Sequence, residues 1–262
     1  MFKISNCHRI VVKIGTSTLT HDEGHLNLRR IEALVKTLSD FKNAGKEVVL
    51  VSSGAIGMGV GKLNLPGKPA DMPTKQAAAA VGQCELMYTY DRLFTQYNHT
   101  VAQMLLTGED VDHDDRRQNI ENTICRLLEL DALPIINEND TVATAEIKVG
   151  DNDTLGAIVA CTIEADLLVL LSDIDGLYTA DPHKDAHAAL IPVVEEITAE
   201  IEALGGGVGS GLGTGGMATK LRAAKLVTQA GCDMVIANGD KPELLYDIVD
   251  GQPVGTRFLG KK

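Results

Sequence analysis

The sequence lacks the long apolar runs that would place it in a membrane. No stretch approaches the roughly 18 consecutive apolar residues that a membrane-spanning helix needs. The amino terminus, MFKISNCHRIVVKIG, has no apolar segment long enough for a secretory signal peptide. Tryptophan is absent and other aromatic residues are scarce. We therefore expect a cytoplasmic protein without a membrane partner.

Cysteine and positive charge are also in short supply. The five cysteines are irregularly spaced and several lie in apolar segments, which indicates neither a disulfide framework nor a zinc cluster and favours buried free thiols. The formal net charge of −12 opposes phosphate backbones at long range, so we expect no nucleic-acid partner. Any phosphate ligand must then meet a local cluster of lysines.

The length and composition favour one soluble α/β domain. A chain of 262 residues with 44% hydrophobic and 23% charged residues can bury a large core and is not disordered. No linker rich in proline, glycine or serine divides it, so we expect a single domain over residues 1–262.

Short β-branched apolar runs alternate with longer amphipathic stretches. Residues 28–45 and 119–130 have apolar residues at helical spacing. The pattern predicts a doubly wound, mainly parallel sheet covered by helices on both faces, with ligands at the carboxyl ends of the strands. The expected strands lie near residues 10, 48, 100, 134, 167 and 234.

The common phosphate-binding fingerprints are missing. The chain contains neither G-x-x-x-x-G-K-[ST] nor a G-x-G-x-x-G after its first strand, and the α/β-hydrolase and protein-kinase motifs are absent too. Instead, residues 205–216 hold eight glycines and run directly into a helical pattern that carries Lys220. Such a segment can expose backbone N–H groups toward an anion at the start of a helix, although its composition alone is equally typical of a flexible linker.

Two predicted strands end in small-residue loops. Lys13 interrupts the first apolar run just before Gly15, in VVKIGTS. The second strand ends at Ser52 and Ser53, followed by Gly54, in VSSGAIGMG. Each loop alone is also consistent with a solvated lysine or an ordinary turn, but the pair favours an anion site.

Residues 136–157 are dense in asparagine, aspartate and glutamate. This mixture suits an amino-acid substrate, whose ammonium group needs acceptors such as Asp140 and whose carboxylates need donors such as Asn152. The same residues are also typical of turns and of a helix start near Asp153. Ser172 follows another strand and begins a loop that suits either a nucleotide or a structural turn.

Three further segments have less specific patterns. Residues 107–117 are expected to form a charged loop, and the alternation in residues 141–151 predicts a small hairpin at the rim of the sheet. The histidine pairs near residues 21–25 and 183–187 lack supporting ligands, so solvated histidines are favoured over a metal site.

Taken together, VVKIGTS, VSSGAIGMG, INENDTVATAEIKVGDND and SGLGTGGMATK resemble the amino acid kinase family over essentially the whole chain. Within that family, the third and fourth segments resemble the members that phosphorylate free glutamate. The resemblance implies a three-layer α/β/α sandwich. It also implies the short form of the enzyme, without a carboxyl-terminal PUA domain.

By this resemblance Lys13 and Lys220 act on the transferring phosphoryl group, with Asp153 positioning them. Ser53, Asp140 and Asn152 bind the substrate. No protein metal ligand is assigned. The nucleotide-binding positions implied by the family are Lys13, Gly15, Ser172, Asp173, Thr214, Gly215, Gly216, Met217, Ala218, Thr219 and Lys220.

The implied reaction is transfer of the γ-phosphoryl group of ATP, with Mg²⁺, to the side-chain carboxylate of L-glutamate, which is the first step of proline biosynthesis. The resemblance further implies feedback inhibition by proline, a homo-oligomer (dimer or tetramer), and hand-off of the product to glutamyl phosphate reductase. Two alternatives are a relative acting on acetylglutamate, carbamate or a nucleoside monophosphate, and a non-catalytic amino-acid sensor.

Overall fold

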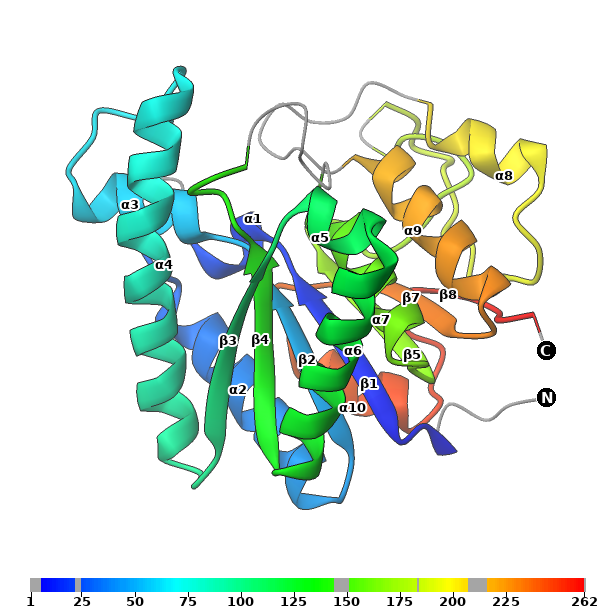
Figure 1. Cartoon of the computed structure of the whole chain (residues 1–262). Helices are drawn as coiled ribbons and strands as arrows, with labels where there is room; N and C mark the ends of the chain where they lie inside the picture. The colour runs from blue at the N-terminus through cyan, green and yellow to red at the C-terminus, as the bar shows by residue number, and fades with distance from the viewer. Residues whose placement is uncertain (1–5, 22–24, 144–150, 183, 207–215, 262) are drawn as a thin grey trace.

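The computed structural model describes residues 6–21, 25–143, 151–182, 184–206 and 216–261. In this part of the chain eight strands form one sheet in the order β3-β4-β2-β1-β5-β7-β8-β6 (Figure 1). The pairs from β3 through to β7 are parallel, and only β8 runs antiparallel to its neighbour β7. The strands are β1 (Arg9–Ile14), β2 (Glu47–Ser52), β3 (Thr100–Leu106), β4 (Ala132–Glu138), β5 (Leu167–Ser172), β6 (Val193–Val194), β7 (Asp233–Asn238) and β8 (Thr256–Phe258).

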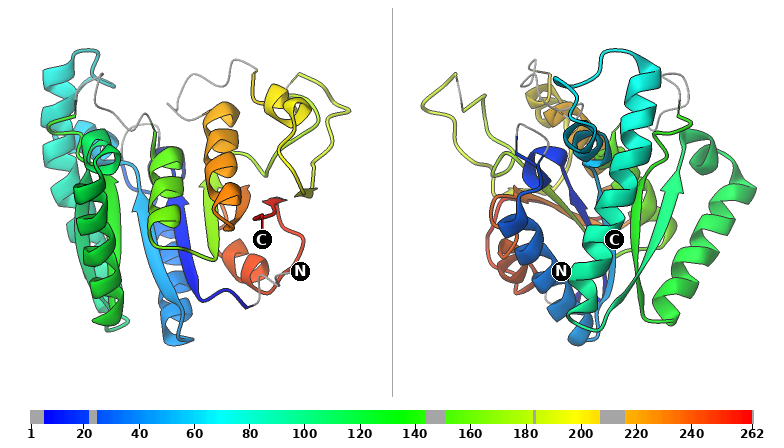
Figure 2. Two further views of the ribbon diagram at one scale, coloured as in Figure 1. Left: turned by 45° about the vertical axis from the view of Figure 1, so that its right-hand side comes forward. Right: turned by 90° about the vertical axis from the view of Figure 1, so that its left-hand side faces the viewer.

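Helices cover both faces of this sheet (Figure 2). None of the described helices combines the length and the apolar character needed to cross a lipid bilayer. The helices are α1 (Thr16–Leu19), α2 (Leu28–Asn43), α3 (Ala55–Lys62), α4 (Met72–Thr95), α5 (Gly108–Asp112), α6 (Asp114–Glu129), α7 (Asn152–Thr162), α8 (Ala199–Leu204), α9 (Met217–Gln229) and α10 (Leu244–Val249).

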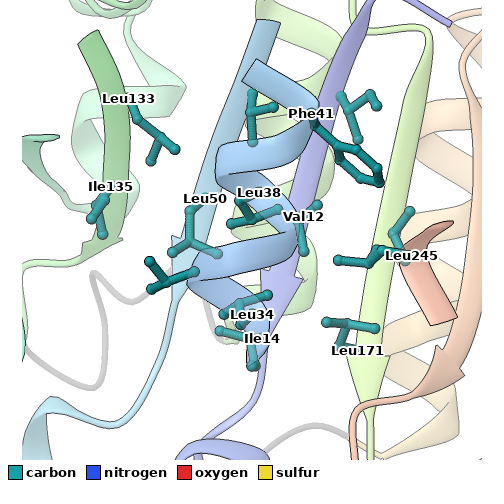
Figure 3. Packing of buried hydrophobic residues seen from close by; sticks show 14 of the residues in the cluster. Val12, Ile14, Leu34, Leu38, Phe41, Leu50, Leu133, Ile135, Leu171 and Leu245 are labelled. Atoms are coloured by element: carbon teal, nitrogen blue, oxygen red, sulfur yellow. The ribbon is translucent and has the colours of Figure 1, made fainter. Parts of the chain in front are cut away.

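Alternating strand residues build two separate cores. Val12 and Leu50 pack with α2, α4 and α10 on one face, where Figure 3 shows Leu34, Leu38 and Phe41 of α2 against the sheet. Residues of opposite parity, beginning with Val11 in β1, pack with α6, α7 and α9 on the other face. Successive side chains of a strand point to opposite faces, so continuous apolar strands fill both cores. The predicted three-layer α/β/α sandwich with a mainly parallel sheet is confirmed.

The expected loop over residues 107–117 is wrong, because most of this segment is helical. Thr107 caps α5 in a reciprocal capping box with Asp110, which satisfies backbone N–H groups at the helix start. Asp114 and Asp115 then lie in the first turn of α6, where negative charge is favourable. The charges that suggested a loop are therefore helix-start signals.

The remaining expectations have mixed outcomes. Strand β3 is only partly buried because it lies at the edge of the sheet, next to β4 alone. The hairpin predicted at 141–151 falls mostly on residues 144–150, outside the described part of the chain. All five cysteines are free as predicted, but only Cys7 and Cys232 are buried and Cys84 is exposed.

Candidate active site

Two lysines from distant parts of the chain meet at one carboxylate. Lys13 Nζ lies 2.6 Å from Oδ1 of Asp153, and Lys220 Nζ lies 3.0 Å from Oδ2 of the same residue. All three side chains are almost completely buried. We call these residues the lysine–aspartate cluster. It carries one formal positive charge and lies at the carboxyl edge of the sheet, where the parallel strands end.

The fold explains how these groups come together. Lys13 shares its parity with Val11, so its side chain points to the face covered by α7 and α9. Gly156 in α7 leaves room for it, since a Cβ atom there would lie 3.4 Å from Lys13 Cβ. Asp153 is in the first turn of α7 and Lys220 in the first turn of α9. Two helices and the central strand thus each contribute one charged group.

Electrostatics keep Asp153 ionised. Burial alone would raise its pKa, but the nearby charges of Lys13 and Lys220 outweigh burial and lower the pKa to about 2. The carboxylate therefore holds both ammonium groups in a fixed arrangement at neutral pH. The Thr219 hydroxyl lies 3.1 Å from Asp153 Oδ2 and 2.8 Å from the carbonyl oxygen of Gly216, so its one proton is shared between these two acceptors.

The helix that carries Lys220 begins where the glycine-rich segment ends. Gly216 is the N-cap residue of α9 and has no side chain, so it provides no side-chain cap for the first-turn N–H groups of Met217 and Ala218. This arrangement suits an anion at the helix start. Thr214 and Gly215, which the sequence also assigned to the nucleotide, lie outside the described residues.

A chain of side-chain hydrogen bonds lies beside the lysine–aspartate cluster. Asn152, which precedes Asp153, donates from Nδ2 to Ser53 Oγ at 2.7 Å and to Asn137 Oδ1 at 2.9 Å. Asn137 in turn donates from Nδ2 to Gln83 Oε1 at 2.9 Å. We call Ser53, Asn152, Asn137 and Gln83 the amide chain. The structure thus brings together Ser53 and Asn152, two of the predicted substrate-binding residues, and Asn152 directly precedes Asp153 in the chain.

The geometry of Asn152 differs from the expected one. The sequence suggested that its amide donates to a substrate carboxylate, yet both of its N–H groups already have protein acceptors.

Asp140 lies in the turn after β4 and is partly buried. Asp151, just before Asn152, accepts the N-cap hydrogen bond of α7 from Thr154, so the helix start and the site occupy the same few residues.

The loop after β5 lies at the same edge of the sheet. Ser172 is buried at the strand end and donates to Oδ1 of its exposed neighbour Asp173 at 3.0 Å. Its carbonyl accepts from Gly239 after β7 at 2.7 Å. Gly15 follows β1 and donates to the carbonyl of Leu171. The nucleotide candidates on β1 and β5 therefore lie on adjacent strands, as the topology requires.

Comparison with known proteins gives the family of the chain. Residues 8–238 match the family model described as the amino acid kinase family. The chain belongs to the amino acid kinase family. It is 52% identical over 263 residues to a glutamate 5-kinase of Clostridium perfringens, covering 99% of this chain and 98% of that relative. It is 54% identical over 260 residues to a glutamate 5-kinase of Carboxydothermus hydrogenoformans, covering 99% of this chain and 70% of that relative.

Solved structures of less similar kinases share the fold. A carbamate kinase from Giardia lamblia bound to AMP-PNP superposes with a TM-score of 0.69 at 17% identity, covering 97% of this chain and 99% of that one. A T. acidophilum isopentenyl phosphate kinase gives a TM-score of 0.65 at 18% identity, with 95% and 99% covered. At such identities the likeness speaks for the architecture of this amino acid kinase alone.

Sequence reasoning missed three residues that support the site. Gln83 and Tyr90 lie seven residues apart on α4, so they face the same way. Gln83 ends the amide chain, and the Tyr90 hydroxyl lies 2.9 Å from Ser52 Oγ, behind the β2 loop. Asn137, the third, is buried in β4. A buried polar residue within an otherwise apolar helix face or strand was the available signal.

Proposed function

We propose that this chain transfers the γ-phosphoryl group of ATP to the side-chain carboxylate of L-glutamate, giving L-glutamyl 5-phosphate and ADP. The observation that carries the proposal is the convergence of Lys13 and Lys220 on Asp153, directly beside the polar groups of the amide chain. The identity to glutamate 5-kinases over nearly the whole chain supports the choice of glutamate over acetylglutamate, carbamate or nucleoside monophosphates. Retention of both lysines argues against a non-catalytic sensor.

The chemistry needs positioning and charge stabilisation more than proton transfer. A glutamate side chain with a pKa of about 4.3 is already ionised at neutral pH, so its oxygen attacks phosphorus without a general base. The new bond joins this oxygen to the γ-phosphorus, while the bond from that phosphorus to the β–γ bridging oxygen breaks and its electrons leave with ADP. Lys13 and Lys220 would stabilise the negative charge that spreads over the transferring group.

Asp153 would act as the positioning group for these lysines. Its two oxygens contact different ammonium groups, so it sets the direction from which each lysine meets the phosphoryl oxygens. Because the cluster is buried, the lysines act in an environment that weakens charge interactions less than water does. The site is thus prepared before the nucleotide binds.

The nucleotide would lie across the carboxyl ends of β1, β5 and the start of α9. We assign its phosphates to Lys13, Gly15 and the first turn of α9, including Thr219 and Lys220. Ser172 and Asp173 border the same edge. Among the described residues no group of three or more histidine, cysteine or acidic side chains is arranged to hold a metal ion. Mg²⁺ would arrive on the phosphates of ATP, because this ion is commonly held by substrate phosphates together with only one or two protein carboxylates.

Trapping of the acyl phosphate tests the proposed reaction. Hydroxylamine converts an acyl phosphate to a hydroxamate, so hydroxamate should form only when ATP and free L-glutamate are both present. Acetylglutamate and carbamate, supplied separately, should give no ATP turnover. Glutamate-independent ADP release, or turnover with acetylglutamate in place of glutamate, would reject the proposal.

We extend the proposal to regulation and assembly on the strength of the family alone. Proline would inhibit by competing with glutamate, the chain would form a homodimer or tetramer, and glutamyl phosphate reductase would receive the labile product. Initial rates at several proline and glutamate concentrations test inhibition by proline. Light scattering tests the homo-oligomer, because a monomeric mass at assay concentration would contradict it. Faster trapping by hydroxylamine than by added reductase would count against direct hand-off.

A further inference from the structure

The amide chain has a defined direction because a backbone group begins it. The N–H of Glu138 donates to the side chain of Asn137 at 2.9 Å, and a backbone N–H is always a donor. The atom of Asn137 that it meets is therefore Oδ1, which leaves Nδ2 to face Gln83. The atom of Gln83 at that contact must then be the acceptor Oε1.

The same reasoning assigns the donors and acceptors at the other end of the amide chain, where the substrate would bind. Asn137 Oδ1 also accepts from Asn152, so the Asn152 atom at that contact is Nδ2. The second N–H of this nitrogen goes to Ser53 Oγ at 2.7 Å. Ser53 thus accepts within the protein and keeps its O–H proton to donate, while Asn152 keeps its carbonyl oxygen Oδ1 to accept.

Gln83 is the far end of this chain and has no role in the assignments made above. It projects from α4, is 7% exposed and offers Asn137 one acceptor at 2.9 Å. Its Nε2 atom is buried and has no hydrogen-bond partner among the described residues. A glutamine that is buried with its Nε2 atom unsatisfied costs stability. Its hydrogen bond with Asn137 is the contact that can explain why a glutamine lies at this position.

We propose that Gln83 is a positioning residue: by holding the Asn137 amide, it turns Asn152 Oδ1 toward the substrate ammonium group and the Ser53 hydroxyl toward a substrate carboxylate. This inference rests on the proposed function, because it takes an amino acid with both groups as the ligand. Gln83 Oε1 accepts from Asn137 Nδ2, and the backbone N–H of Glu138 donates to Asn137 Oδ1. Both ends of the Asn137 amide are therefore held. Without Gln83, the amide keeps only one anchor outside the site.

The Gln83→Met variant tests this role, since it keeps the length of the side chain and removes the oxygen. We expect the KM for glutamate to rise about tenfold, which corresponds to roughly 1.4 kcal/mol. The KM for ATP and the kcat at saturating glutamate should change less than threefold. If Gln83→Met does not fold, Gln83→Leu, which also lacks the oxygen, is measured instead. The matched control is Gln96→Met at the exposed C-cap of the same helix, which should leave all three constants unchanged.

Rescue and coupling separate positioning from a general structural effect. Gln83→Glu restores an acceptor oxygen and should bring the KM for glutamate to within threefold of wild type. In an Asn137→Ala background the Gln83→Met change should no longer affect this constant, because the contact that transmits it is gone. Equal increases in the KM for ATP and for glutamate, or an undiminished effect in the Asn137→Ala background, would overturn the positioning role.

The wild-type protein, assayed in parallel, keeps the two proposals apart. Failure of the wild type to form a glutamate-dependent hydroxamate would reject the proposed function. A wild type that forms hydroxamate beside a Gln83→Met variant with normal glutamate KM would reject the positioning role alone.

Discussion

Lys13 Nζ lies 2.6 Å from Asp153 Oδ1, and this ion pair joins the end of the central strand to the start of α7. Both side chains are almost completely buried. Burying two charges is costly, and such a pair is weak evidence for stability by itself. Its position at the edge where strand-end loops meet, with a second lysine on the other carboxylate oxygen, favours a catalytic purpose.

Removal of either buried lysine should abolish most of the turnover. Lys13→Ala or Lys220→Ala takes away one of the two ammonium groups that would stabilise the transferring phosphoryl group, so we expect kcat to fall by at least about 10²-fold. The measurement is ATP-dependent hydroxamate formation at saturating glutamate, with circular dichroism to show that the fold persists.

Lys62→Ala is the matched control, because this lysine also forms an ion pair, with Glu85, but is exposed on the surface. It should leave kcat unchanged. A folded Lys13→Ala or Lys220→Ala variant with kcat within threefold of wild type would contradict the catalytic assignment.

The ionisation of Asp153 should make part of the stability depend on acidity. Its pKa is lowered from 3.8 to about 2 in the folded protein, so the unfolded chain binds a proton more readily. The stabilising contribution, about 2 kcal/mol, is therefore complete above the unfolded pKa and is lost as the pH falls from about 4 toward 2.

Urea unfolding of wild type and Asp153→Asn isolates this contribution. The variant cannot titrate at this position, so the difference between the two unfolding free energies should shrink by about 1 kcal/mol from pH 5 to pH 3. A difference that stays constant over this range would show that Asp153 is not held ionised by the two lysines.

The hydroxyl of Tyr90 should stabilise the loop that carries Ser53. Tyr90 is fully buried on α4, its pKa is raised by that burial, and its hydroxyl lies 2.9 Å from Ser52 Oγ. Ser52 also donates to the carbonyl of Ser53 at 3.1 Å. We expect Tyr90→Phe to lower the unfolding free energy by about 1–2 kcal/mol and to raise the KM for glutamate more than that for ATP.

The exposed Tyr88 on the same helix provides the control for this change. Tyr88→Phe removes a hydroxyl that water already satisfies and should alter neither stability nor kinetics. Equal effects of the two substitutions would show that the Ser52 contact is without consequence.

The sequence was most informative where function requires an unusual residue in a regular pattern. Lys13 interrupts an apolar strand, and Lys220 follows a glycine-rich segment, so both could be predicted to face a ligand. Asp153 could not be separated from a helix-start residue by local pattern. The structure explains why: Asp151 caps α7, and Asp153, two positions later, pairs with the lysines.

The contacts of the missed residues depend on packing that no local pattern reveals, even where a polar residue in an apolar helix face or strand marks the position. Gln83 and Tyr90 are polar positions in a long helix, and their partners on β4 and β2 are set by tertiary structure alone. The helix in residues 108–112 was missed for another reason. Its capping box, from Thr107 to Asp110, was readable in the sequence but was overridden by the density of charge.

The contact between α3 and α4 should tolerate no side chain at Gly82. A Cβ atom at this position would lie 1.7 Å from the carbonyl oxygen of Ala55 and 2.4 Å from the backbone nitrogen of Gly59. Backbone atoms cannot move aside cheaply, so Gly82→Ala must push the two helices apart. We expect a loss of about 3 kcal/mol in unfolding free energy, measured by urea denaturation.

The shift should also reach the site, because α3 begins directly after Ser53 and Gly54, and Gly82 is the neighbour of Gln83. The KM for glutamate should therefore rise in whatever fraction of Gly82→Ala remains folded. Gly67→Ala is the matched control, since a Cβ atom there would have no heavy atom within 4 Å, and both its stability and its kinetics should equal those of wild type. A Gly82→Ala protein as stable as the Gly67→Ala protein would mean that the two helices do not approach as closely as described, and that α4 does not hold the strand-end loops at a fixed distance.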